Sequence, residues 1–233
     1  MKTIADRIIA FNRSLSFKGT LPPNIRIMNP FKEDKQAVKV SETFYEKYYS
    51  DNNPRRLILG INPGRFGAGA TGVPFTDPKR LIEKLEIEYH GKLLHEPSSV
   101  FVYEMIDAFG GAEAFYANFY INSVCPLGFT IIDKNGKEKN YNYYDSKELL
   151  TAVREFAVWN IQKQIAISGT GDICYCMGTG TNLKILQKIN QEHRFFNTII
   201  SLEHPRFIVQ YKQKQKEHYI RQYVMKLNEH RFV

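Results

Sequence analysis

Three polar side chains, Asn62, Asn122 and His204, each stand at the end of a short apolar run of the sequence. An asparagine amide carries one acceptor and two donor hydrogens, so it can orient a water molecule or pair with the edge of a heterocycle, although it is a poor general base. A histidine can donate a hydrogen bond to an oxygen on which negative charge develops. Each residue also has a plain structural interpretation, such as closing a turn at a strand end.

The loop that contains Asn62 is rich in glycine, with five glycines in residues 60–75. Glycines permit tight turns and let a ligand lie against bare backbone. A generic phosphate-binding loop is one interpretation, but the loop has neither the Gly-x-x-x-x-Gly-Lys-Ser/Thr pattern nor a Gly-x-Gly-x-x-Gly pattern that opens a helix. Phe75, at the end of the loop, offers an apolar face to a planar ligand or, alternatively, to the core.

The apolar runs predict the elements that must position these residues. Four of them read as buried parallel strands that each feed a helix: residues 56–61, residues 119–121 with their flanks, residues 173–177 and residues 198–202. Such an alternation predicts an α/β fold with three αβα layers around a central, mostly parallel four-stranded sheet. Ligands of such sheets bind beyond the carboxyl ends of the strands, so Asn62, Phe75, Asn122 and His204 should converge there.

Helix boundaries are also marked in the sequence. The signals are an N-cap and first-turn pair at Asp77–Pro78, a cap at Ser98 or Ser99 for a helix that stops at Gly110–Gly111, a capping box of Asp145 with Glu148, and a buried stripe of Ile220, Tyr223, Val224 and Leu227. We expect residues 1–233 to form a single domain, because no linker or repeat divides the chain.

Charge and cysteine content narrow the class of protein. The 233 residues carry a formal net charge of +8, which favours a polyanionic partner such as nucleic acid without requiring one. Cys125, Cys174 and Cys176 have no zinc-site spacing and are too few for a four-cysteine cluster, so buried thiols are expected, with no metal and no redox cofactor. The start of the chain lacks a signal-peptide core and no run is long enough to span a membrane, which fits a reducing cytoplasm.

The glycine-rich loop resembles the first motif of the single-strand-selective monofunctional uracil-DNA glycosylases, the SMUG type of the uracil-DNA glycosylase superfamily. That motif reads Gly-Met-Asn-Pro-Gly-x-Phe-Gly and then Thr-Gly-Val-Pro-Phe. Residues 60–67 read Gly-Ile-Asn-Pro-Gly-Arg-Phe-Gly, and residues 71–75 read Thr-Gly-Val-Pro-Phe at the same spacing. Residues 122–127 are similar to the family's Asn-x-x-Cys-Pro-Leu, and His204–Pro205 stands where the family has His-Pro-Ser-Pro-Arg.

The resemblance implies a monofunctional glycosylase that hydrolyses the N-glycosidic bond of uracil, or of a related deaminated or modified base, in DNA during base excision repair. Asn62 would hold the attacking water and His204 would donate a hydrogen bond to O2 of the base. Asn122 would pair with N3–H and O4, and Phe75 would stack on the flipped base. Ile61 and Gly64 would complete the base pocket; the enzyme would need no cofactor, and we expect it to be a monomer.

Three departures from the family pattern leave the preferred base open and indicate a divergent bacterial branch. Arg206–Phe207–Ile208 replaces Ser-Pro-Arg, so Arg206 or Phe207 is the candidate wedge in the base stack. Arg65 replaces a proline, and residues 68–70 are smaller than their counterparts.

A basic segment follows His204. Residues 203–233 carry seven Lys or Arg against three Glu. Lys212, Lys214 and Lys216 are candidate contacts to single- or double-stranded DNA, and a solvated basic helix face is the alternative. No lysine lies in the motifs, which disfavours a lyase. Two further classes remain: a nucleic-acid-binding module that kept this fold without catalysis, and a nucleotide-binding enzyme of doubly wound fold.

Overall fold

The computed structural model describes residues 2–232 and is built around a four-stranded parallel sheet. Its strands are β2 (Arg56–Gly60), β3 (Phe119–Ser123), β6 (Ile173–Met177) and β7 (Thr198–Leu202), in the order β3-β2-β6-β7. All three pairings are parallel, so the carboxyl ends of the four strands lie at one edge. β2 and β3 are almost wholly buried, as continuous apolar runs require. The predicted sheet is confirmed.

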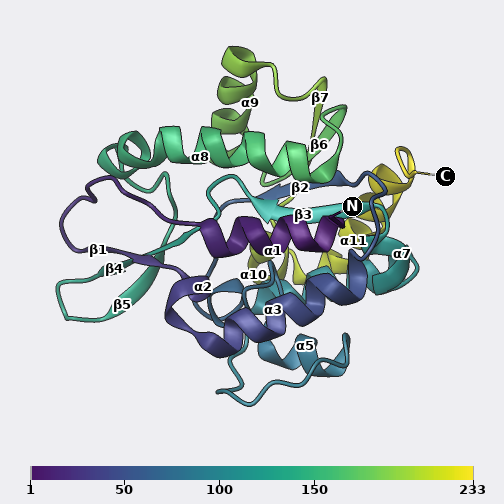
Figure 1. The fold of residues 1–233 in the computed structure, drawn as a ribbon, viewed down its shortest axis with the longest axis horizontal. Helices are drawn as coiled ribbons and strands as arrows, with labels where there is room; N and C mark the ends of the chain where they lie inside the picture. The colour runs from purple at the N-terminus through teal and green to yellow at the C-terminus, as the bar shows by residue number, and fades with distance from the viewer. Residues whose placement is uncertain (1, 233) are drawn as a thin grey trace.

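Helices cover both faces of this sheet, which confirms the α/β fold. One group packs through α1 against α3 and α8, and the other packs through α6 against α10 and α11. Figure 1 shows α1 and α3 toward the viewer, with the yellow helices α10 and α11 behind them. The helical segments are α1 (Ile4–Ser14), α2 (Pro30–Glu33), α3 (Lys35–Tyr48), α4 (Ala68–Thr71), α5 (Pro78–Glu83), α6 (Pro97–Phe109), α7 (Ala112–Tyr116), α8 (Lys147–Ser168), α9 (Thr181–His193), α10 (Pro205–Tyr211), the 3-10 turn η1 (Gln213–Gln215) and α11 (Lys216–Asn228).

A second, antiparallel sheet was not predicted from the sequence. It consists of β1 (Ile25–Met28), β4 (Gly128–Ile132) and β5 (Glu138–Tyr141), in the order β1-β4-β5, and it stands beside the main sheet in Figure 1. β4 begins directly after Leu127, and β5 leads into the segment before α8. The exposed and half-buried residues of β5 carry no apolar run that would reveal a strand. This sheet matters because the end of β5 borders the cavity described below.

The predicted helix starts are right at α5 and displaced elsewhere. Asp77 caps α5, because its carboxylate accepts a hydrogen bond from Arg80 N at 2.9 Å. α6 begins at Pro97 after Glu96, not after a serine cap; the Ser99 hydroxyl donates instead to the Glu96 carbonyl. Proline is well suited to the first helical position, since it has no N–H to leave unpaired. α6 ends before Gly110, as predicted.

The predicted cap of α8 is displaced by one residue, and the predicted apolar face of α11 is confirmed. Ser146, rather than Asp145, caps α8, because the Asp145 carboxylate is taken by Asn142 N. α11 buries Ile220, Tyr223 and Leu227 as one stripe, while Val224 is half-buried at its margin; these four residues confirm the predicted apolar face. Within residues 2–232, no helix combines the length and apolar character needed to cross a membrane.

The predicted buried thiols are confirmed: Cys125, Cys174 and Cys176 are free and buried. Burial raises the pKa of the Cys125 thiol to about 12, so it stays protonated and unreactive at neutral pH.

Candidate active site

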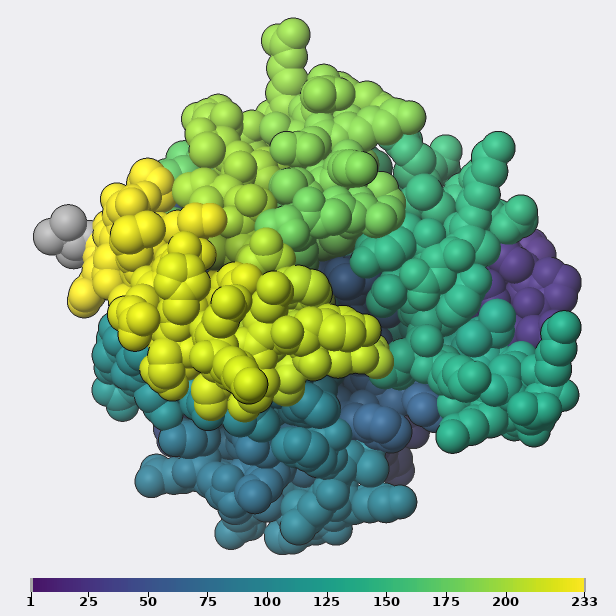
Figure 2. All heavy atoms as spheres, turned by 180° about the vertical axis from the view of Figure 1, so that it is seen from behind, coloured from purple at the N-terminus to yellow at the C-terminus, as the bar shows by residue number. Residues whose placement is uncertain are grey.

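A cavity of about 320 Å³ opens at the carboxyl ends of the strands. Figure 2 shows a hollow between the yellow-green C-terminal segment and the teal-green segment around β4 and β5. The lining comes from five parts of the chain: Ile61, Asn62, Pro63 and Gly64 after β2; Phe75; Glu96 and Ser98 at the start of α6; Asn140, Asn142 and Tyr144 around the end of β5; and His204, Arg206, Phe207, Gln210 and Tyr211 on α10. Seven residues singled out in the sequence therefore meet in one place, and Asn122 and the three lysines are outside it.

Asn62 is held by the backbone of the segment that follows β5. Its Nδ2 donates to the Tyr141 carbonyl at 3.2 Å, and its Oδ1 accepts from Tyr143 N at 2.9 Å. The donor on Tyr143 identifies which end of the amide is the oxygen. Because an amide oxygen has two lone pairs, Oδ1 can still accept one hydrogen bond from a ligand or a water. Asn62 thus joins the two sheets and keeps one acceptor for the cavity.

A buried hydrogen bond between two side chains holds Tyr143, whose backbone N–H binds Asn62. The Tyr143 hydroxyl donates to Asn182 Oδ1 at 2.9 Å, and both side chains are buried. Asn182, in the first turn of α9, donates through Nδ2 to the carbonyls of Gly60 and Met177, both at 3.4 Å. Asn182 therefore binds the carboxyl ends of β2 and β6 and also the segment that orients Asn62. No sequence pattern marked Tyr143 or Asn182, because their roles depend on contacts 39 positions apart.

His204 is a neutral hydrogen-bond donor in this cavity. It is the N-cap of α10, and its Nδ1 accepts a hydrogen bond from Arg206 N at 3.1 Å. An accepting nitrogen carries no proton, so the proton of the neutral ring is on Nε2. Burial, followed by the charge of Arg206, lowers the pKa of His204 to about 4. At neutral pH the ring is therefore uncharged and has one N–H to offer.

Phe75 is placed by an uncommon backbone conformation. Its φ of 53° is left-handed, which costs a non-glycine residue on the order of 1 kcal/mol. Its ring centroid lies 6.1 Å from that of His204, with the rings tilted by 54°. A Cβ on Gly60 would come within 3.0 Å of the Phe75 ring, so only glycine lets the ring approach β2 this closely. The strained loop thus sets an aromatic face beside the imidazole.

Asn122 does not line the cavity, and its amide is already engaged. Its Nδ2 donates to the Tyr120 hydroxyl at 2.7 Å, and its Oδ1 accepts from Ser123 N at 2.8 Å. The residue is 6% exposed. Each end of the amide has capacity for one more hydrogen bond. Recognition of a base would use this second capacity and would require the base to reach beyond the cavity lining, so the role of Asn122 stays a prediction.

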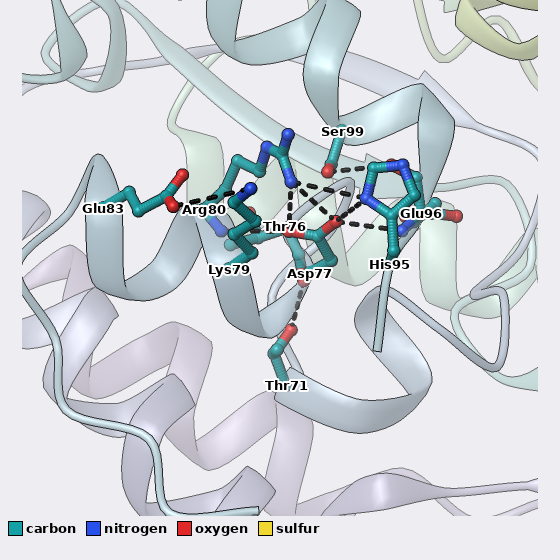
Figure 3. Close-up of polar contacts among 9 residues, drawn as sticks. All are labelled: Thr71, Thr76, Asp77, Lys79, Arg80, Glu83, His95, Glu96 and Ser99. Atoms are coloured by element: carbon teal, nitrogen blue, oxygen red, sulfur yellow. Dashed lines mark hydrogen bonds and ion pairs between the residues drawn. The ribbon is translucent and has the colours of Figure 1, made fainter. Parts of the chain in front are cut away.

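Glu96 lines the cavity and was not expected there. Figure 3 shows how it is presented: the buried Asp77 carboxylate accepts from Glu96 N at 2.9 Å and lies 3.3 Å from Arg80 Nη1 and 3.4 Å from His95 Nδ1. The carboxyl of Glu96 points away from this cluster. Burial, with repulsion from Asp77, raises its pKa to about 7 against the pull of Arg206. In the sequence Glu96 is only an acidic residue before a proline.

Of the basic C-terminal residues predicted to contact DNA, Arg206 lines the cavity and the three lysines lie outside it. Arg206 lines the cavity, as does Phe207, whose ring lies 5.7 Å from that of the exposed Tyr211. Lys214, on η1, is exposed, whereas Lys216 pairs with Glu104 of α6 at 2.7 Å. Lys216 is thus committed to an ion pair within the fold.

A parallel α/β sheet whose carboxyl edge gathers an amide, an aromatic ring and a neutral imidazole defines a protein suited to hold a planar heterocycle against a hydrogen-bond donor. The sequence model of the uracil DNA glycosylase superfamily matches residues 46–228, and the chain belongs to that superfamily. The crystal structure of wild-type SMUG2 from Pedobacter heparinus has a TM-score of 0.96 and 62% identity, with 98% of each chain covered. The resemblance to the SMUG type is therefore confirmed. Comparison with curated protein sequences gave no match.

Proposed function

We propose that the protein is a monofunctional DNA glycosylase that hydrolyses the N-glycosidic bond of uracil, or of a related deaminated or modified base, in DNA. The observation that carries this proposal is the neutral His204, with its donor proton on Nε2, in the same cavity as Asn62 and Phe75. The similarity to SMUG2 supports it.

The proposed reaction needs stabilisation of a leaving base more than strong acid or base catalysis. As the bond from C1′ to the base breaks, its electron pair moves onto the base, and the sugar becomes oxocarbenium-like. His204 Nε2–H donates to O2 of the base as negative charge builds there. Asn62 Oδ1 orients a water whose oxygen then bonds to C1′, and the proton that this water loses neutralises the departed base. A neutral imidazole suits this role, because it loses no proton to the base.

Base recognition would combine stacking and hydrogen bonding. The cavity is roomy enough for a flipped nucleobase, and such enzymes read the extruded base by stacking and by its hydrogen-bonding edge. Phe75 would supply the stacking face, Ile61 and Gly64 the walls, and Asn122 its remaining donor and acceptor. The proposed hydrolysis uses only these side chains and a water molecule, so it requires neither a metal ion nor a redox cofactor.

The DNA itself would be held at the rim of the cavity. Arg206 and Phe207 stand at the mouth, and Phe207 with Tyr211 offers an exposed aromatic pair that could fill the gap left by an extruded base. Lys212 and Lys214 would contact phosphates. We expect Lys216 to contribute less, because it is paired with Glu104.

The decisive experiment is abasic-site formation on a uracil oligonucleotide, revealed by alkaline cleavage under single-turnover conditions. Asn62→Ala and His204→Ala should each slow it strongly; one preorganised donor is typically worth about a hundredfold. Both variants should still bind the oligonucleotide, as the phosphate contacts are untouched. An inactive wild-type protein that binds DNA normally would instead favour a non-catalytic nucleic-acid-binding module.

A further inference from the structure

We propose that Glu96 is a further residue of the base pocket, which acts as a protonated carboxylic acid and donates a hydrogen bond to a carbonyl oxygen of the flipped base. The ligand class is an oxo base, one with a ring carbonyl next to an N–H. The inference rests on the proposed glycosylase function.

The glycine-rich loop makes room for this carboxyl. A Cβ on Gly64 would lie 3.1 Å from Glu96 Oε1, and a Cβ on Gly67 would lie only 1.9 Å from Oε2. Real Cβ atoms do not approach an oxygen at 1.9 Å, so the carboxyl occupies space that exists only because residue 67 is glycine. Glu96 and Gly64 both line the cavity, and Gly64 is two residues from Asn62.

The carboxyl has no hydrogen-bond partner among residues 2–232. Two neighbouring hydrogen bonds use the Glu96 backbone and not its carboxyl: Glu96 N donates to Asp77, and the Ser99 hydroxyl donates to the Glu96 backbone carbonyl. Glu96 is half-buried and lines the cavity, so its carboxyl oxygens can be reached from the cavity. A carboxyl that is fixed at its backbone, faces a cavity and lacks a partner is therefore available to a ligand.

The charged groups around Glu96 oppose its ionisation. From the N-cap of α5 it faces the buried Asp77 carboxylate, which pairs with Arg80 and lies 3.4 Å from His95 Nδ1 on the segment before α6. From α10 it faces Arg206, the one opposing influence, and His204, which is neutral. Arg65 of the loop pairs with Glu138, and the β5 side contributes the uncharged amides of Asn140 and Asn142. Burial and Asp77 outweigh Arg206, so the pKa is raised to about 7.

The protonated form matches the chemistry of the proposed reaction. A carboxylic acid has one donor and an acceptor, which is complementary to a ring carbonyl next to an N–H, whereas a carboxylate can only accept. A departing base also gains negative charge, which a carboxylate in the same cavity would oppose. Glu96 in its acid form would thus add a second donor to that of His204.

The test compares wild type with Glu96→Gln, which retains a donor and an acceptor but cannot titrate. Single-turnover rate constants for one uracil oligonucleotide are measured from about pH 6 to about pH 9, and the ratio of wild type to variant is taken, so that ionisation of the DNA cancels. We expect a ratio that is constant near pH 6 and falls by about tenfold by pH 8, because a group with a pKa of about 7 is then about one-tenth protonated. Glu83→Gln, on the exposed face of α5, is the matched control and should keep the wild-type profile.

A ratio that stays constant from pH 6 to pH 9, in an active wild-type enzyme, would overturn the role of Glu96 and leave the proposed function intact. No abasic site from the wild-type protein at any pH would overturn the proposed function itself. Glu96→Ala gives a second check, independent of pH: it should slow the reaction at pH 6 by about tenfold, as expected for one hydrogen bond, with DNA affinity unchanged.

Discussion

The hydrogen bond between Tyr143 and Asn182 should control both the stability of the protein and the orientation of Asn62. Tyr143→Phe removes the hydroxyl and leaves Asn182 Oδ1 buried without that donor. Loss of a buried hydrogen bond with one unsatisfied partner costs about 1–3 kcal/mol. For a domain of 150–250 residues, each kcal/mol shifts Tm by about 2–4 °C. We therefore expect Tm to fall by about 4–8 °C for a loss of about 2 kcal/mol.

The functional effect should be smaller than that of removing Asn62 itself. Tyr143→Phe keeps the backbone N–H that holds Asn62 Oδ1, but it frees the segment that carries this N–H from the start of α9. We expect the single-turnover rate to drop by about tenfold, equivalent to about 1.4 kcal/mol, while the DNA dissociation constant is unchanged. A structural lesion alone would lower Tm without this selective loss of rate.

A double-mutant cycle isolates the interaction. Tyr143→Phe, Asn182→Ala and the double variant are compared by urea denaturation, which gives the free energy of unfolding for each. Because the two side chains share one bond, the double variant should be less destabilised than the sum of the single variants by about 1 kcal/mol. Additive losses, or a Tyr143→Phe enzyme with the wild-type rate, would refute the assignment of this pair as the anchor of Asn62.

Three further predictions follow from the site. Because His204 has its pKa lowered to about 4 from an ordinary 6.5, the unfolded chain binds a proton that the folded chain does not between these values. This contribution of His204 to stability should therefore be lost as pH drops from about 6.5 toward 4, whereas the raised pKa of Glu96 acts in the opposite direction. The difference in unfolding free energy between wild type and His204→Asn, which keeps a cap, isolates the His204 contribution and should fall as pH drops in denaturation titrations. Gly67→Ala should displace Glu96 and lower activity, whereas Gly180→Ala, where a Cβ meets nothing within 4 Å, should leave the melting temperature near that of wild type. Lys212→Glu with Lys214→Glu should reduce the slope of log DNA affinity against log salt by about 0.7–0.9 per lost contact. An unchanged slope would mean that these lysines are only solvated surface. Lys216→Glu should act mainly on stability, since it breaks the pair with Glu104.

Much of the fold was predictable because it depends on local patterns. Continuous apolar runs identified the four parallel strands, and the Asp77–Pro78 pair identified the start of α5. Strand β5 escaped prediction, since its residues are largely exposed and carry no apolar period. The starts of α6 and α8 were displaced because several polar residues compete for each cap, and which one wins depends on neighbouring chain segments.

For the site, the sequence by itself determined that Asn62, Phe75 and His204 would stand at the carboxyl edge of one sheet, because parallel strands deliver their following loops to a common edge. It also determined the glycines at 60 and 67, where a Cβ would meet the Phe75 ring at 3.0 Å and the Glu96 carboxyl at 1.9 Å.

Only the tertiary structure decided the state of each group. The proton of His204 is placed on Nε2 by a backbone N–H two residues away and its charge is suppressed by burial, neither of which a residue type reveals. Glu96 became a group of the cavity because Asp77 holds its backbone from a helix nineteen positions earlier. Lys216 is paired with Glu104, 112 positions away, a contact that the basic run of the sequence does not reveal. Hydrogen-bond partners, burial and charge come from long-range contacts, and these exist only once the chain has folded.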